Sequence, residues 1–152
     1  MWVKLSTRGE YGLRAMFDLA QRYGEGPIPL KSIAERQDIS EHYLEQLIAI
    51  LRKAGLVKSV RGAQGGYTLS QEPHEITVGD IIRVLEGPIA PVECLNDDGS
   101  ENCKHEDTCV TKDIWEKVRD SISDVLDSFT LGDMLERSNK MKQKNKNYMY
   151  YI

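Results

Sequence analysis

The sequence is poor in aromatic residues and has no long apolar run. Aromatic side chains make up 7 % of the 152 residues, a fraction better suited to a helical protein than to a large sheet. No stretch reaches the roughly 18 consecutive apolar residues that a transmembrane helix needs. The opening residues, Met-Trp-Val-Lys-Leu, carry neither an apolar signal-peptide core nor a cleavage site. We therefore expect a cytoplasmic protein with no membrane partner.

Cysteine is scarce, and its distribution is uneven. All three cysteines, Cys94, Cys103 and Cys109, lie within sixteen residues. An odd number of cysteines in a cytoplasmic protein argues against a disulfide framework. The chain also lacks a nucleophile–base motif, and no Lys-Ser/Thr pair follows Gly66, as a phosphate-binding loop would require. We expect no enzyme, and metal or redox chemistry becomes the leading interpretation of the cysteine segment.

The net charge of −4 hides an asymmetry between the two halves of the chain. Residues 1–67 carry ten Lys/Arg and seven Asp/Glu (+3), whereas residues 68–152 carry ten and seventeen (−7). Local charge decides whether a surface can approach phosphates. The N-terminal half is therefore a plausible DNA-binding face.

Hydrophobic periodicity and turn signals predict a mostly α fold with a small β-hairpin wing. A Gly-rich tip, residues 61–66, separates two short β runs, Leu56–Val60 and Tyr67–Leu69. Four helices are expected in this part of the chain. The first runs from Ser6 or Thr7 to about Tyr23, and the second covers about Leu30–Gln37. The third runs from an N-cap at Ser40 to about Ala54, and the fourth from a cap at Thr77 to about Leu85. This order is that of a winged helix-turn-helix, followed here by a long C-terminal dimerisation helix.

The helix that begins at Ser40 is the expected recognition helix. Its core stripe is Leu44, Leu47, Ile48 and Leu51, and its opposite face is polar. Glu45 can accept a hydrogen bond from cytosine N4, and Gln46 can bond adenine at N6 and N7. At the hairpin tip, Arg61 suits a narrow minor groove and Gly62 allows close backbone approach. The predicted DNA-binding residues are Ser40, His42, Tyr43, Glu45, Gln46, Arg52, Arg61 and Gly62.

The remaining chain divides into three predicted segments after a DNA-binding domain at residues 1–88. Residues 89–111 form a cysteine-bearing loop, and a loop this long in a small protein is usually functional or disordered. Residues 112–135 form a helix whose apolar side chains need a partner, most simply the same helix of a second subunit. Residues 136–152, rich in lysine and tyrosine, are expected to be a flexible tail.

Three runs of residues resemble the IscR/NsrR/CymR family of bacterial winged-helix regulators. They are residues 39–46 (ISEHYLEQ), 51–57 (LRKAGLV) and 59–67 (SVRGAQGGY), and residues 78–82 and 130–133 are similar to the family as well. The resemblance implies a homodimer that binds a pseudo-palindromic operator on double-stranded DNA and represses transcription. In members with three loop cysteines it implies a 2Fe-2S or 4Fe-4S cluster, of which we favour 2Fe-2S.

The spacing of the cysteines, C-x8-C-x5-C, is three residues longer in its first interval than the common IscR pattern. Iron–sulfur clusters are usually held by four protein ligands, most often cysteine thiolates. The three cysteines therefore leave the fourth ligand to be supplied by another residue. IscR supplies a histidine three residues after its last cysteine, but here that residue is Lys112. Glu10 aligns with the carboxylate that NsrR-like members contribute from the partner subunit, and His105 is the second, less favoured candidate.

Other readings of the loop stay open. Cys94, Cys103, His105 and Cys109 could form a tetrahedral Cys3His zinc site, although their spacing is uncommon for zinc. Cys103 and Cys109 could instead form a reversible disulfide. A cluster-free dimer that binds a protein partner, such as a metabolic enzyme, is the remaining alternative. Under the leading hypothesis, ligation at the cysteines orders the loop and thereby changes operator affinity.

Overall fold

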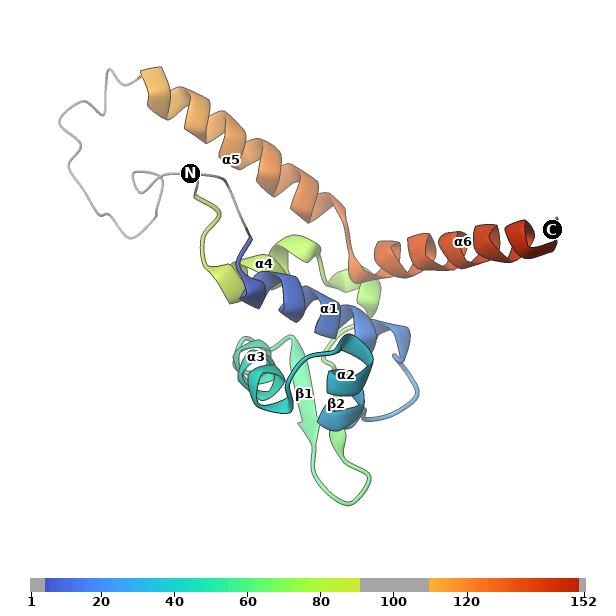
Figure 1. Cartoon of the computed structure of the whole chain (residues 1–152). Coiled ribbons are helices and arrows are strands. Elements are labelled where there is room, and N and C mark those ends of the chain that lie inside the picture. The colour runs from blue at the N-terminus through green and yellow to red at the C-terminus, as the bar shows by residue number, and fades with distance from the viewer. Residues whose placement is uncertain (1–4, 91–109, 151–152) are drawn as a thin grey trace.

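The computed structural model describes residues 5–90 and 110–150, with side chains as far as residue 147. It consists of a small helical body with a β-hairpin at one end and two further helices that leave it (Figure 1). The elements are α1 (Thr7–Gln21), α2 (Leu30–Gln37), α3 (Glu41–Lys53), β1 (Val57–Val60), β2 (Gly66–Leu69), the 3-10 helix η1 (Pro73–Glu75), α4 (Val78–Glu86), α5 (Val110–Ser128) and α6 (Leu131–Tyr150). The mostly α winged helix-turn-helix predicted from the sequence is confirmed.

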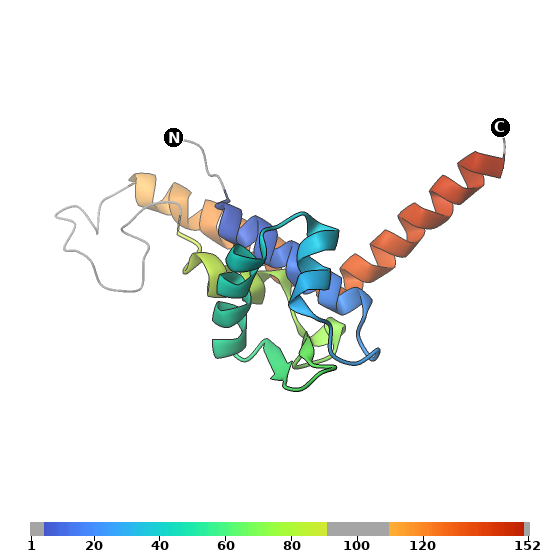
Figure 2. The ribbon, with the colours of Figure 1, turned by 60° about the horizontal axis from the view of Figure 1, so that its bottom comes forward.

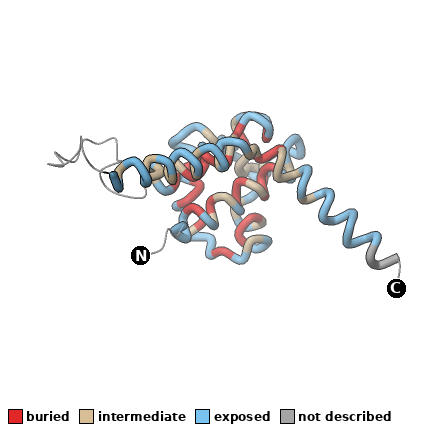
Figure 3. The backbone as a smooth tube through the Cα atoms, turned by 90° about the horizontal axis from the view of Figure 1, so that it is seen from above, coloured by how far each residue is buried: buried red, intermediate tan, exposed pale blue. Residues whose placement is uncertain are grey.

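The hydrophobic core lies among α1, α2, α3 and α4, and buried positions concentrate there (Figure 3). All four residues of the predicted α3 stripe are at most 1 % exposed. On α1, Met16 and Ala20 are buried, while Leu13 and Phe17 are only half-buried. Full burial of one Leu or Ile side chain is worth about 1.5–3 kcal/mol, so the α3 stripe holds this helix firmly to the body.

The hairpin pairs β1 with β2 in antiparallel register, with Val57 opposite Leu69 and Val60 opposite Gly66. Ile28 adds an isolated bridge to the outer side of Tyr67 through two backbone hydrogen bonds of 2.8 and 2.9 Å. A Cβ atom at Gly66 would lie 2.3 Å from the Ile28 carbonyl oxygen, so only glycine permits this approach. The chain before α2 therefore braces β2 at the end of the hairpin next to the tip loop.

Two capping boxes meet where α4 and α6 begin. Thr77 accepts from the Asp80 amide at 3.0 Å, and Thr130 accepts from the Asp133 amide at 3.1 Å; each aspartate accepts from its threonine's amide in return. The two threonines form a β-bridge, and the Val78 amide donates to the Phe129 carbonyl at 2.8 Å. This backbone pairing starts both helices at one place in the body.

Two expectations for the C-terminal part were wrong. Residues 112–135 do not form one helix, because α5 ends at Ser128 and the Thr130 capping box starts α6. Residues 136–150 are helical as the continuation of α6, where an unstructured tail was expected. Lysine, methionine and glutamine are good helix formers, so a well-capped helix propagates through this polar stretch.

α5 and the outer part of α6 contribute little to the core, and they leave the body in different directions (Figure 2). α5 contains no buried residue. It is tied to α4 by a bidentate ion pair, in which Arg83 donates to Asp127 at 2.7 and 2.8 Å. In the described part of the chain, none of the helices has the length and apolar character needed to cross a bilayer.

Candidate nucleic-acid interface

α3 presents one polar face to solvent, as its sequence predicts. The Ser40 side chain accepts from the Tyr43 amide at 3.2 Å and caps the helix, and Ala54 follows at its C-terminal end. Gly55 then takes a positive φ of 84°, which ends the helix and turns the chain toward β1. Opposite the buried stripe, every residue of the predicted polar face is exposed: His42, Glu45, Gln46, Ala49, Arg52 and Lys53.

Side chains of this face are arranged by local hydrogen bonds. The Nε2 atoms of His42 and Gln46 lie 3.3 Å apart, one helical turn from each other. Near the other end of α3, Arg52 donates to the Ser59 hydroxyl of β1 at 3.5 Å. Glu45 lies exposed between them along the helix. The face thus offers several exposed hydrogen-bond donors and acceptors, the kind of group that reads base edges in a major groove.

The wing places Arg61 and Gly62 at its exposed tip. Gly62 has a φ of 120°, a conformation that side chains rarely adopt, and its carbonyl accepts from the Gly65 amide at 3.0 Å. The tight turn therefore depends on glycine, and it carries the arginine away from the body. Arg61 is therefore exposed at the tip, and its contact with DNA stays a prediction.

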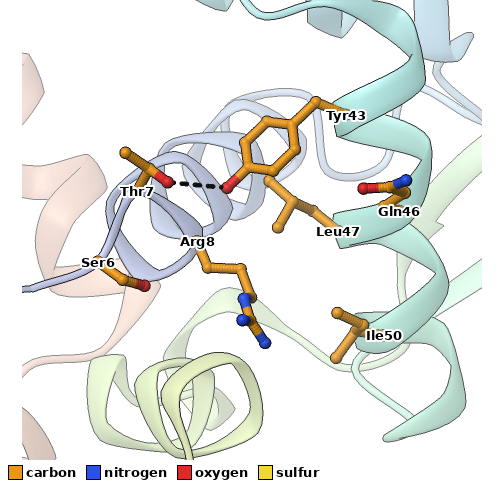
Figure 4. Close-up of a pocket in the computed structure, with 7 residues that line it drawn as sticks. All are labelled: Ser6, Thr7, Arg8, Tyr43, Gln46, Leu47 and Ile50. Carbon is orange, nitrogen blue, oxygen red and sulfur yellow. Dashed lines mark hydrogen bonds between the residues drawn. The ribbon is translucent and has the colours of Figure 1, made fainter.

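The start of α1 contacts α3 directly, a contact that sequence reasoning missed. The hydroxyls of Thr7 and Tyr43 are 3.2 Å apart (Figure 4). The rings of Tyr11 and Tyr43 meet edge to face, with their centroids 6.2 Å apart. The guanidinium of Arg14 lies over the ring of Tyr11, 5.3 Å from its centre. The first turns of α1 and α3 are therefore linked by polar and aromatic contacts at one end of the recognition helix.

A second missed residue, Glu86, holds the start of α1 from the opposite side. This last residue of α4 accepts from the backbone amides of Ser6 at 3.1 Å and Gly9 at 2.9 Å, and from the Ser6 hydroxyl. Gly9 leaves room for the carboxylate, because a Cβ atom there would lie 2.6 Å from Glu86 Oε1. The small residues Gly9 and Gly12, three apart on α1, were the sequence signal for this close approach.

A buried carboxylate joins α1 to α2. Asp18 is 1 % exposed and accepts from Arg36 at 2.8 and 2.9 Å and from Gln37 at 3.0 Å, with Arg22 at 3.4 Å. Burial opposes ionisation of Asp18, but these hydrogen bonds and the two guanidinium charges outweigh it and hold the pKa of Asp18 below its ordinary value. The ionised carboxylate fixes the position of α2, the helix that precedes the recognition helix.

Of the five predicted metal ligands, four lie outside the described residues: Cys94, Cys103, Cys109 and His105. Glu10 is exposed in the first turn of α1, close to the contacts made by Thr7 and Gly9. Over residues 5–90 and 110–147, no three His, Cys, Asp or Glu side chains come together as a metal-binding group.

A short helix, a turn, an exposed capped helix and an arginine-tipped hairpin together define a winged-helix DNA-binding protein. The chain belongs to the Rrf2 family, described as iron-dependent transcriptional regulators, whose family model matches residues 5–137. The resemblance found in the sequence is thus confirmed, and the protein is a transcriptional regulator rather than an enzyme.

Individual relatives agree with this assignment. The chain is 53 % identical over 150 residues to the HTH-type transcriptional regulator CymR of Bacillus subtilis, covering 99 % of this chain and all of the relative. Its fold is similar to that of T. potens IscR, with a TM-score of 0.74, 62 % identity, and coverage of 90 % of this chain and 88 % of the other. The fold is also similar to that of CymR, described as the global cysteine regulator of B. subtilis. The TM-score is 0.73 and the identity 55 %, and the match covers 90 % of this chain and 98 % of the other.

Proposed function

We propose that this regulator is a cytoplasmic homodimeric repressor whose operator affinity depends on an iron–sulfur cluster held by Cys94, Cys103 and Cys109. The observation that carries the proposal is the position of the three thiols. They occur in the segment that joins the end of α4 to the start of α5, and hence the DNA-binding body to the helix offered for dimerisation. The family description as iron-dependent regulators supports the same reading.

The donor set fits an iron–sulfur cluster. Three thiolates are soft ligands for iron, and the missing ligand would come from Glu10 of the partner subunit or, less favourably, from His105. Glu10 is exposed, so its carboxylate is available to a group brought by another subunit. When bound, the cluster, 2Fe-2S by preference, supplies a crosslink among the thiols that is sensitive to oxidants and nitric oxide.

The exposed apolar face of α5 supports the dimer. Ile114, Trp115 and Val125 are 51, 39 and 57 % exposed, although they recur at helical spacing on one side of α5. An isolated subunit leaves this face in water, where it costs free energy in proportion to its area. A second copy of α5 is the simplest cover, because a two-fold axis pairs like faces.

Operator recognition would use α3 and the wing. His42, Glu45 and Gln46 face the major groove, while Arg61 reaches the neighbouring minor groove or backbone. In a two-fold dimer, the two recognition helices must lie about 34 Å apart, one turn of DNA. Whatever changes the orientation of α3 relative to α5 therefore changes operator affinity.

Contacts of Glu86 would couple a change in the cysteine segment to the position of α3. It ends α4 four residues before the last described residue of this body, Ala90, and it grips the first turn of α1 through Ser6 and Gly9. That turn in turn contacts α3 through Thr7 and Tyr43. A displacement of Glu86 would therefore move the base-reading face, and a coupling of about 1–3 kcal/mol would give about 5–150-fold regulation.

A site without an iron–sulfur cluster is the second candidate, and the similarity to CymR, described as the global cysteine regulator of B. subtilis, favours it. Three forms of this candidate are open. Cys103 and Cys109 could form a reversible disulfide, or zinc could bind Cys94, Cys103, His105 and Cys109. In the third form, a partner protein binds the dimer. Iron, sulfide and zinc, counted per subunit after anaerobic purification, separate these readings. Iron and sulfide in equal amounts with visible absorbance, lost in Cys94→Ala, support the cluster; zinc alone, or no metal, supports the second candidate.

A further inference from the structure

A pocket opens between the first turn of α1 and the side of α3 (Figure 4). Its volume is about 460 Å3, and Gln46, a predicted base-reading residue, lines it. Leu47 and Ile50 of α3 form its apolar side. On the α1 side lie the hydroxyl of Thr7, hydrogen-bonded to Tyr43, and the guanidinium of Arg8, which extends into the pocket. The pocket therefore combines one cation with the hydroxyls of Thr7 and Tyr43 beside α3. A third hydroxyl, that of Ser6, also lines it and donates to Glu86.

Arg8 differs from Arg14, Arg36 and Arg83 in having no partner in residues 5–90 and 110–147. Arg36 and Arg83 each make bidentate pairs with an aspartate, and Arg14 donates to the Gln37 carbonyl at 3.2 Å. Arg8 makes no such bond with a described residue, and it is exposed. A guanidinium offers five donors in a planar fork that matches a phosphate group.

In residues 5–90 and 110–147, no acidic side chain forms an ion pair with this guanidinium. The Glu86 carboxylate keeps its charge, but it is directed at the amides of Ser6 and Gly9. Glu10 follows Arg8 by two residues, so it points about 200° around α1 from it. The side chains that line the pocket therefore carry one positive charge and no negative one.

We propose that Arg8, with the hydroxyls of Thr7 and Tyr43, binds a phosphate of the DNA backbone at the edge of the major groove that α3 enters. This inference rests on the proposed role of α3 as the recognition helix. α3 would then be held by cations on two sides, Arg8 at the start of α1 and Arg61 on the wing that follows its end. The phosphate contact carries no sequence information, and it fixes how α3 is turned when Gln46 meets a base.

Arg8→Gln tests the proposal, with binding measured across a salt series on a duplex that the wild-type protein selects from a random library. We expect affinity to fall about tenfold at low salt, equally on selected and unselected duplexes. The proposed dimer carries two copies of Arg8, so the slope of log K against log salt should become less steep by about 1.8. Lys117→Gln, which removes an exposed cation from α5, should change neither quantity.

Two further variants keep the result interpretable. Arg8→Lys retains the charge and should retain the salt slope while binding less tightly, because an ammonium lacks the planar fork. Thermal unfolding of each variant identifies any loss of fold. An unchanged slope in Arg8→Gln, or a loss confined to particular sequences, would overturn the phosphate contact. Gln46→Ala separately tests α3: if it leaves base preference intact, the recognition-helix proposal fails, whatever Arg8 does.

Discussion

Glu86 Oε1 lies 2.9 Å from the Gly9 amide nitrogen, so the end of α4 accepts a hydrogen bond from the first turn of α1. This contact spans 77 positions of sequence, and it is possible only because Gly9 has no Cβ atom. It joins the part of the chain that leads to the cysteines with the part that touches the recognition helix. The regulatory account depends on it.

Replacing Glu86 by alanine should loosen the first turn of α1. The amides of Ser6 and Gly9 would lose their acceptor, and the helix would lose a carboxylate at its positive end. We expect a loss of about 1 kcal/mol in the free energy of unfolding and a smaller difference in operator affinity between cluster-loaded and cluster-free protein.

Glu86→Gln is the matched control because it keeps a side-chain oxygen as acceptor. It should retain most of the stability in a denaturant titration and most of the affinity difference. An alanine variant that unfolds and responds like wild type would show that Glu86 does not couple the two regions.

The buried Asp18 predicts an acid-dependent loss of stability. Because its pKa is lower in the folded chain than in the unfolded chain, the unfolded state takes up the proton first as the pH falls. The stabilisation is fully present above the ordinary pKa of about 3.9 and is lost as the pH falls through the folded value. Asp18→Asn should cost about 2 kcal/mol at pH 7 and weaken this pH dependence, as urea titrations at pH 7 and pH 3 would measure.

Asp124→Asn, at an exposed position of α5, serves as the control for that titration. It should change the free energy of unfolding by less than about 0.5 kcal/mol at either pH. Equal stabilities for wild type and Asp18→Asn at pH 7 would contradict the structural role of the buried carboxylate.

Base recognition by α3 predicts a position-specific effect of Glu45→Ala and Gln46→Ala. Each should relax preference at one base pair of each half-site by about 1–3 kcal/mol and leave the salt dependence unchanged. Competition binding with a set of singly substituted duplexes measures this. A uniform loss over all substituted duplexes would mean that these residues do not read bases.

The apolar face of α5 predicts self-association. Val125→Asp introduces a charge at a residue that is 57 % exposed in the single chain, so it should not disturb the core. If two α5 helices pair through this face, the variant should sediment as a monomer while wild type sediments as a dimer. Asp120→Lys, on the opposite side of α5, should leave the dimer intact; a dimeric Val125→Asp protein would place the interface elsewhere.

Much of the DNA-binding body could be predicted because its signals are local. The Ser40 cap, the end of its helix near Ala54 and the cap at Thr77 each depend on residues within one turn, and all three appear in the structure. α2 occupies the predicted residues Leu30–Gln37. Local hydrogen bonds and hydrophobic periodicity suffice for these elements.

The features that sequence reasoning missed depend on long-range contacts or on a signal left unused. Gly9 and Gly12 indicate that another element approaches α1 closely, but no local feature of the sequence identifies Glu86 as the residue that accepts from Ser6 and Gly9. The break between α5 and α6, in contrast, could have been found, because Thr130 and Asp133 repeat the spacing of Thr77 and Asp80. The apolar period that continues to Phe129 concealed that second cap.

Operator affinity with and without the cluster tests the central claim most directly. Wild-type protein purified without oxygen, and the same protein after iron removal, would be titrated against one selected duplex at fixed salt. A variant with Cys94, Cys103 and Cys109 all changed to alanine would be titrated alongside. The account predicts dissociation constants that differ at least about fivefold between the two wild-type forms and do not differ for the variant after the same treatments. Equal affinities of the two wild-type forms would contradict it.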